Sequence, residues 1–154
     1  MPRIVVISDT HGLLRPEALA FLRGADAIVH AGDIGGPEVL TALAAIAPLT
    51  AVRGNNDHGT WADDVPETAL VRFAGVAVYV VHDAGELRRT PAPRDARVVV
   101  AGHSHKPGVA ERNGVLHVNP GSAGPRRFRL PIAVAELAID GTTVDARVVE
   151  LTVG

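Results

Sequence analysis

The sequence of 154 residues contains no cysteine, and this absence excludes whole classes of structure and chemistry. It can form no disulfide framework, no thiol nucleophile and no thiolate metal site. Any metal ion must therefore be bound by nitrogen and oxygen atoms. Lysine occurs once, at Lys106, whereas arginine is common, and we attribute that imbalance to genomic base composition.

Long hydrophobic runs and an excess of positive charge are also missing. The formal net charge is -2, so we expect no nucleic-acid polymer and no membrane as a partner. The apolar run at 4–7 is shorter than the ~7–15 residues of a signal peptide, and no stretch approaches the ~20 residues of a membrane span. We therefore expect a cytoplasmic, soluble protein with a single domain over residues 1–154.

In the first half of the chain, short apolar strands alternate with helices that begin at a proline. The expected strands are 4–7, 27–31 and 49–52, and the expected helices between them are 16–23 and 37–46. Such a βαβαβ alternation predicts a parallel sheet with right-handed crossovers.

The second half has a different pattern, dominated by turn signals between apolar runs. We expect hairpins at 69–81 and 132–151, strands at 98–101 and 115–118, and a polar loop with two prolines at 88–95. This half predicts mostly antiparallel strands. Two packed sheets with helices outside would accommodate both halves, so the predicted class is α/β.

Polar residues that can bind metal follow the apolar strands, most of them beside a glycine. They are Asp9, His11, Asp33, Asn55, His82, His103 and His105. In open α/β sheets, ligands collect at the carboxyl ends of strands, and glycine lets the backbone approach closely. We therefore expect these side chains to converge on one site.

These side chains are too many for one tetrahedral ion and suit two ions that share a carboxylate, with Asp33 the expected bridge. The pairs Asp9/His11 and His103/His105 are two residues apart, and in extended backbone that spacing sends both side chains to the same side. Mixed oxygen and imidazole ligands favour manganese, our first expectation, or iron, zinc, cobalt or nickel, over calcium or magnesium.

A pair of ions typically ~3.5–4 Å apart can hold a bridging hydroxide for in-line attack on phosphorus. We therefore assign a catalytic role to Asp33, Asn55 and His103. The residues that follow Asn55, namely Asn56, Asp57 and His58, and the hydroxyl of Ser122 are candidate substrate contacts.

Each of these features has a simpler structural interpretation when it is taken alone. Asp-x-His and Gly-Asp often form helix caps or turns, and a lone histidine such as His82 after a valine run is more often a satisfied core residue. His30, within an expected strand, has that interpretation. The joint occurrence of all the groups at strand ends favours the metal site.

Together the motifs resemble the calcineurin-like metallophosphoesterases, and in particular the small YfcE-like phosphodiesterases, from Ile4 to about Leu151. They are Asp9-Thr10-His11, Gly32-Asp33, Gly54-Asn55-Asn56-Asp57, His82, Gly102-His103-Ser104-His105 and Asn119-Pro120-Gly121-Ser122. The resemblance implies a four-layer α/β/β/α sandwich with two mixed sheets and the metal site at the carboxyl ends of strands.

The resemblance also implies two ligand sets that share Asp33. The first metal would be bound by Asp9, His11, Asp33 and His105, and the second by Asp33, Asn55, His82 and His103. Many relatives have a histidine, proposed to protonate the leaving group, at the position of Asn56, and a second histidine at the position of Ala84. A homodimer is common among them.

The expected function is therefore a dinuclear metal-dependent phosphodiesterase for a small phosphodiester or nucleotide-like substrate. A phosphomonoesterase of the same fold is the near alternative, less favoured because poor leaving groups need more help from a proton donor. A non-catalytic metal-binding scaffold and a nucleotide sensor without turnover are the alternatives from other functional classes.

Overall fold

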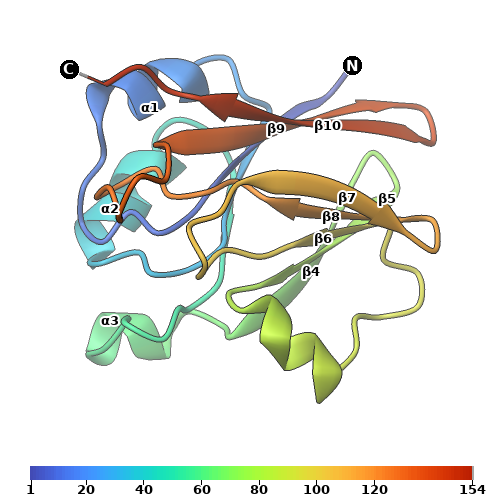
Figure 1. Cartoon of the computed structure of the whole chain (residues 1–154), viewed down its shortest axis with the longest axis horizontal. Coiled ribbons are helices and arrows are strands. Elements are labelled where there is room, and N and C mark those ends of the chain that lie inside the picture. Colours follow the sequence, from blue (N-terminus) through green and yellow to red (C-terminus); the bar gives the residue numbers. More distant parts are fainter. Residues whose placement is uncertain (154) are drawn as a thin grey trace.

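Two mixed sheets stack face to face in the computed structural model, which describes residues 1–153 (Figure 1). Gly154, the last residue of the predicted domain, lies outside the described residues. The first sheet has the order β10 (Thr143–Glu150), β9 (Ala133–Asp140), β1 (Arg3–Ile7), β2 (Ala27–His30) and β3 (Leu49–Ala51). The second has the order β4 (Thr68–Phe73), β5 (Val76–Val81), β6 (Val98–Val100), β8 (Val115–Asn119) and β7 (Gly108–Arg112).

The predicted parallel core of the first sheet is confirmed. Strand β1 pairs in parallel with β2, and β2 with β3, while the hairpin β9–β10 adds to β1 in antiparallel orientation. The crossovers contain the predicted proline-initiated helices, α1 (Pro16–Leu22) and α2 (Pro37–Ala44). Proline suits the first turn because its missing N–H has no partner there.

The second half of the chain was predicted to supply mostly antiparallel strands, and the pairs β4–β5, β7–β8 and β9–β10 are antiparallel. Parallel pairs were not predicted there, yet within the second sheet β5, β6 and β8 run parallel to one another. The reason is the length of the connections, because β5 and β6 are each followed by a long segment that returns the chain to the same end of the sheet before the next parallel strand begins.

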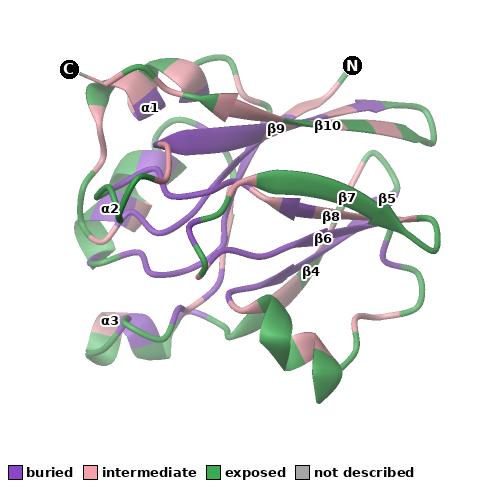
Figure 2. Cartoon of the chain, viewed as in Figure 1, coloured by how far each residue is buried: buried purple, intermediate pink, exposed green. Residues whose placement is uncertain are grey.

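Three short elements were not predicted from the sequence. They are β7, the helix α3 (Thr60–Asp63) and the 3₁₀ helix η1 (Ala84–Arg88). Every residue of β7 is exposed, so the strand has no apolar alternation to mark it (Figure 2). The predicted polar loop at 88–95 is confirmed except for Arg88, which ends η1.

The core consists of layers that alternate along the strands. In β1, Ile4 and Val6 face the second sheet and pack with Val78 and Val98, whereas Val5 and Ile7 face the helices. Successive strand residues point to opposite faces, so a continuous apolar run serves two layers at once. Buried strands of both sheets are visible in Figure 2.

The four predicted layers are present, but the fourth is thin. Helices α1 and α2 cover the outer face of the first sheet, where Leu22 and Leu43 are fully buried. The outer face of the second sheet carries Tyr79, Val81 and Val99, and η1 with the following loop covers it through Leu87 and Ala92. Among residues 1–153, no helix has the length and apolar character needed to cross a membrane.

Replacement of Leu137 tests the layer between the sheets. Leu137 on β9 is fully buried in that layer, so Leu137→Ala should lower the free energy of unfolding by about 2–5 kcal/mol. Leu70→Ala is the matched control, because Leu70 on β4 is 43% exposed and its truncation should cost less than about 1 kcal/mol. Urea unfolding measures both, and equal losses would contradict this assignment of the core.

Candidate metal centre

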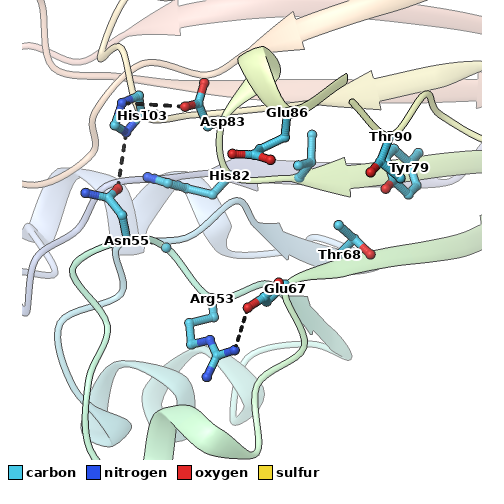
Figure 3. A pocket seen from close by; sticks show the side chains of 12 residues that line it. Arg53, Asn55, Glu67, Thr68, Tyr79, His82, Asp83, Glu86, Thr90 and His103 are labelled. Carbon is cyan, nitrogen blue, oxygen red and sulfur yellow. Dashed lines mark hydrogen bonds and ion pairs between the residues drawn. The ribbon is translucent and has the colours of Figure 1, made fainter. Parts of the chain in front are cut away.

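The predicted ligand side chains gather at one edge of the two sheets. Asp9 and His11 follow β1, Asp33 follows β2, and Asn55 follows β3. From the second sheet, His82 follows β5, and His103 and His105 follow β6. This arrangement agrees with the prediction from the sequence that these residues, scattered over nearly 100 positions, lie close together. Figure 3 shows Asn55, His82 and His103 pointing toward one another.

The backbone at most of these positions is left-handed, which corrects one step of the sequence reasoning. The φ angles are 55° at Asp9, 47° at His11, 57° at Asp33, 69° at His103 and 61° at His105. The pairs Asp9/His11 and His103/His105 are therefore not extended, and His103 and His105 turn to different partners. Left-handed backbone is strained for a residue with a side chain, and such strain gathers at functional sites.

Asp9 is fixed so that one carboxylate oxygen remains free. Its Oδ2 accepts hydrogen bonds from the Ser8 hydroxyl at 2.7 Å and from the His103 backbone N–H at 3.1 Å. Its Oδ1 is buried without a partner and lies 3.4 Å from His105 Nε2. The carboxylate is thus oriented by protein groups on one side and open on the other.

Asp33 is held by the residue that was predicted to contact substrate. The Asn56 backbone N–H donates to Asp33 Oδ1 at 2.9 Å, and the Asn56 side-chain amide donates to Oδ2 at 3.1 Å. Asp33 Oδ2 is also 3.7 Å from His11 Nε2 and 3.4 Å from His82 Nε2. Asn56 therefore positions a carboxylate, and its amide group is already used.

Two buried histidines, His82 and His30, have ring nitrogens fixed by hydrogen bonds to neighbouring groups. His82 Nδ1 is 2.7 Å from the Ala31 carbonyl oxygen, which can only accept, so Nδ1 carries the proton and Nε2 presents a lone pair to Asp33. A metal-binding histidine typically has such a hydrogen bond on its other nitrogen. His30 is the satisfied core histidine that was predicted, with Nδ1 accepting from Gly32 N at 3.0 Å and Nε2 2.9 Å from Thr10 Oγ1.

Several buried polar atoms in this cluster have no hydrogen-bond partner, and this observation tests whether a metal fits. They are Asp9 Oδ1, His11 Nε2, His82 Nε2, and both ring nitrogens of His105. Buried polar atoms are nearly always paired, so a set of orphaned lone pairs in one place calls for a cation. The residues present therefore fit divalent metal ions.

The same atoms form two overlapping groups of the size that a metal ion requires. One group is Asp9, His11 and His105, the other is Asp9, Asp33 and His82, and within each group the ligand atoms lie within 4.8 Å of one another. Asp9 belongs to both groups. Asp33 lies between His11 and His82, so its role as the bridge remains a prediction that this geometry accommodates.

Asn55 and His103 lie at the rim of the cluster. His103 Nδ1 is 3.2 Å from Asn55 Oδ1, and its Nε2 is 3.9 Å from Asp83 Oδ2 (Figure 3). The His103 side chain is 43% exposed, and its ring meets that of His82 edge-on with centroids 5.2 Å apart. These two residues therefore face the solvent side, from which a substrate would approach.

The two buried carboxyl groups have pKa values shifted in opposite directions. Burial raises the pKa of Asp9 and outweighs the hydrogen bond from Ser8. Burial also opposes ionisation of Asp33, but hydrogen bonds from His82 and Asn56, with the charge of His82, lower its pKa overall. Burial lowers the pKa of His82, but the Asp33 carboxylate and the Ala31 carbonyl outweigh it, so the pKa is raised overall.

Two of the predicted substrate contacts, Asp57 and Ser122, are buried and hydrogen-bonded within the protein. Asp57 is 4% exposed, and its carboxylate accepts from the backbone N–H groups of Ile34, Gly35 and Gly54, so it binds together the loops after β2 and β3. Ser122 is 2% exposed, and its hydroxyl lies within hydrogen-bond distance of the Asp9 carbonyl and the Gly124 N–H. Both are structural supports. His58 is exposed and remains untested.

Glycine at position 102 is required by the close packing around Asp9. A Cβ there would lie 2.0 Å from Ser8 Oγ and 2.6 Å from Asp9 Oδ2. Gly102→Ala should therefore displace the Ser8–Asp9 hydrogen bond and weaken binding of a divalent metal by about 10–100-fold in calorimetric titration. Gly108→Ala is the matched control, because a Cβ at Gly108 meets nothing within 4 Å. Equal metal affinities in the two variants would contradict this role.

His30 makes stability depend on pH. Burial lowers the pKa of His30 from 6.5 to about 3. Between these two pH values, the unfolded chain binds a proton at His30 and the folded chain does not. The contribution of neutral His30 to the free energy of unfolding is complete above pH 6.5. It is lost as the pH falls toward 3, by about 1.4 kcal/mol per pH unit. His30→Gln should be less stable than the wild type at pH 7. Urea unfolding should show that this difference in the free energy of unfolding becomes smaller toward pH 4.5. A difference that stays constant with pH would refute a neutral, buried His30.

Comparison with known proteins places the chain in a family. The model of the calcineurin-like phosphoesterase superfamily domain matches residues 2–142. A protein described as a probable metallophosphoesterase from Methanothermobacter thermautotrophicus is 35% identical over 159 aligned residues, which cover 95% of this chain and 91% of that protein.

Solved structures share the fold at lower sequence identity. A structure described as a novel archaeal phosphodiesterase has a TM-score of 0.77 at 22% identity, with 96% of this chain and 99% of that chain covered. Vps29 from Entamoeba histolytica, solved with Zn²⁺, has a TM-score of 0.73 at 21% identity, with 96% and 98% covered. By the match of the family model and by the identity and coverage of the relative, the chain belongs to the calcineurin-like phosphoesterase superfamily.

Proposed function

We propose that the protein is a phosphodiesterase that depends on two divalent metal ions. The observation that carries this proposal is the set of buried polar atoms without partners on Asp9, His11, His82 and His105, gathered with Asp33 in one cluster, in a family of metal-dependent phosphoesterases. Two divalent ions bound there would supply a water of lowered pKa as nucleophile and positive charge for the phosphoryl oxygens.

The side chains divide into those that hold metal and those that receive the substrate. The proposed ligands of the first ion are Asp9, His11, Asp33 and His105, and those of the second are Asp33, Asn55, His82 and His103. Ser8 and Asn56 fix the orientation of the two carboxylates, Ser8 by a hydrogen bond to one oxygen of Asp9 and Asn56 by hydrogen bonds to both oxygens of Asp33. Manganese is the first metal to test, with iron, zinc, cobalt and nickel beside it.

The rim of the site supports a diester more than a monoester. Asn56 cannot supply a proton at neutral pH, its amide is bonded to Asp33, and Asp57 is buried away from the surface. The chain thus offers little acid to help a poor leaving group, and a substrate with a good leaving group gains most from such a site. The exposed Asn55 amide can donate to a phosphoryl oxygen without adding negative charge.

Replacement of Asp33 tests the proposal. Purified protein supplied with Mn²⁺ should bind about two ions by elemental analysis and hydrolyse bis(p-nitrophenyl) phosphate. Asp33→Ala should reduce both metal content and turnover, the latter by at least ~100-fold, because the ligand that lies between His11 and His82 is lost. Asp145→Ala on the exposed side of β10 is the control and should leave both unchanged.

Three results would contradict the proposal in different ways. Unchanged turnover in Asp33→Ala would refute the metal assignment. Metal binding without turnover on a broad panel of phosphoesters would favour the scaffold or the nucleotide sensor. A preference for p-nitrophenyl phosphate over the diester would favour a monoesterase.

A further inference from the structure

A cavity of about 520 Å³ opens directly beside the metal centre (Figure 3). At one end it is bordered by Asn55, His82 and His103. From there it extends over the outer face of β4 and β5, between the loop after β3 and the segment that contains η1. Pockets for small organic ligands are typically about 300–1,000 Å³, so this one can receive a substituent of a substrate whose phosphate lies at the metals.

The walls of this cavity, which we call the ester pocket, carry an excess of negative charge. Its lining includes the carboxylates of Glu67, Asp83 and Glu86. Arg53 is the one arginine or lysine among the lining residues that the structure describes, and its guanidinium is paired with Glu67 at 2.9 Å. Glu86 has no arginine or lysine in the lining to balance it, and Asp83 faces only the His103 ring, whose Nε2 is 3.9 Å away; Figure 3 shows both carboxylates on the same wall.

A second observation at the far end of the ester pocket also points to a ligand. Tyr79 lines the pocket and is only 7% exposed, but its hydroxyl is not one of the buried polar atoms without a partner among residues 1–153, so this oxygen is open to the pocket. A tyrosine hydroxyl in that position can pair with a bound molecule. The hydroxyls of Thr68 and Thr90 lie in the same part of the lining, so this end offers donors and an aromatic ring beside the carboxylates (Figure 3).

We propose that the ester pocket binds the cationic alcohol portion of a small, soluble amino-alcohol phosphodiester. This inference rests on the proposed function and names the substrate class for it. A substrate of this class has a phosphate at one end and an ammonium group at the other, which matches a site that is positive at the metals and negative at Asp83 and Glu86. An ammonium group also gains from a nearby aromatic ring such as that of Tyr79.

The same charges disfavour the competing substrates. A group with a second phosphate or a carboxylate would place like charges beside Asp83 and Glu86, and such a juxtaposition is repulsive at close range. The volume of about 520 Å³ is too small for the two acyl chains of a phospholipid. The favoured substrate is therefore small and water-soluble.

Two chromogenic diesters that differ in one charge test this inference. p-Nitrophenyl phosphorylcholine and its neutral isostere p-nitrophenyl 3,3-dimethylbutyl phosphate share the leaving group and nearly the same shape. With the manganese-loaded protein, kcat/KM should favour the choline ester by about three- to tenfold, and the preference should shrink as the salt concentration rises. Glu86→Gln should reduce the ratio of the two values, because it removes an unbalanced carboxylate from the wall.

Glu111→Gln is the matched control, because it makes the same change of net charge on β7, at the opposite edge of the second sheet from β4, and should keep the wild-type ratio. Hydrolysis of both esters at equal kcat/KM, or an unchanged ratio in Glu86→Gln, would overturn the inference while leaving the proposed function intact. Absence of turnover on either ester and on bis(p-nitrophenyl) phosphate would instead refute the proposed function. Faster hydrolysis of phosphatidylcholine vesicles than of glycerophosphocholine would contradict a soluble substrate.

Discussion

Two carboxylates with a histidine share one small buried volume, and this constraint organises the structure around them. The ligand atoms of Asp9, Asp33 and His82 lie within 4.8 Å of one another, and Asp9 is fully buried. Like charges so close in a low dielectric are unfavourable unless cations stand between them. The pKa of Asp9 is raised, mainly by burial, whereas hydrogen bonds from His82 and Asn56 lower that of Asp33.

The surrounding hydrogen bonds prevent the two carboxylates and His82 from moving apart. Ser8 and the His103 backbone fix one oxygen of Asp9, Asn56 fixes Asp33, and the Ala31 carbonyl fixes His82. The left-handed backbone at Asp9 and Asp33 adds strain that a relaxed loop would lose. The site is therefore arranged in advance for metal, which lowers the conformational cost of binding it.

The sequence predicted the parallel core of the first sheet and the set of converging side chains because both depend on local patterns. A buried apolar run followed by Asp9, and another followed by Asp33, needs no knowledge of distant contacts. The backbone geometry was different, since the extended Asp9/His11 pair that we expected is in fact a left-handed turn. Backbone conformation of this kind is set by packing between loops, which no pattern of residue types records.

The sequence also could not predict the roles of three polar residues, which are Asn56, Asp57 and Ser122. Each is polar and close in sequence to a ligand, which favours a substrate contact, but their hydrogen bonds are made to Ile34, Asp33 and Asp9, from other parts of the chain. The ester pocket left no signal in the sequence, because Glu67 comes from the loop before β4, Tyr79 from β5 and Glu86 from η1, and these segments meet only in the folded protein.

The metal cluster and the outer layer over the second sheet are built from different segments of the chain. The metal cluster rests on loops tied together by buried hydrogen bonds, whereas the segment 84–95 contributes Leu87 and Ala92 to a minor patch and otherwise faces water. Exposed connections of this kind tolerate changes of length and sequence better than the elements they join. In the proposed phosphodiesterase, the choice of substrate could therefore change through substitutions in this surface segment, while the metal ligands stay the same.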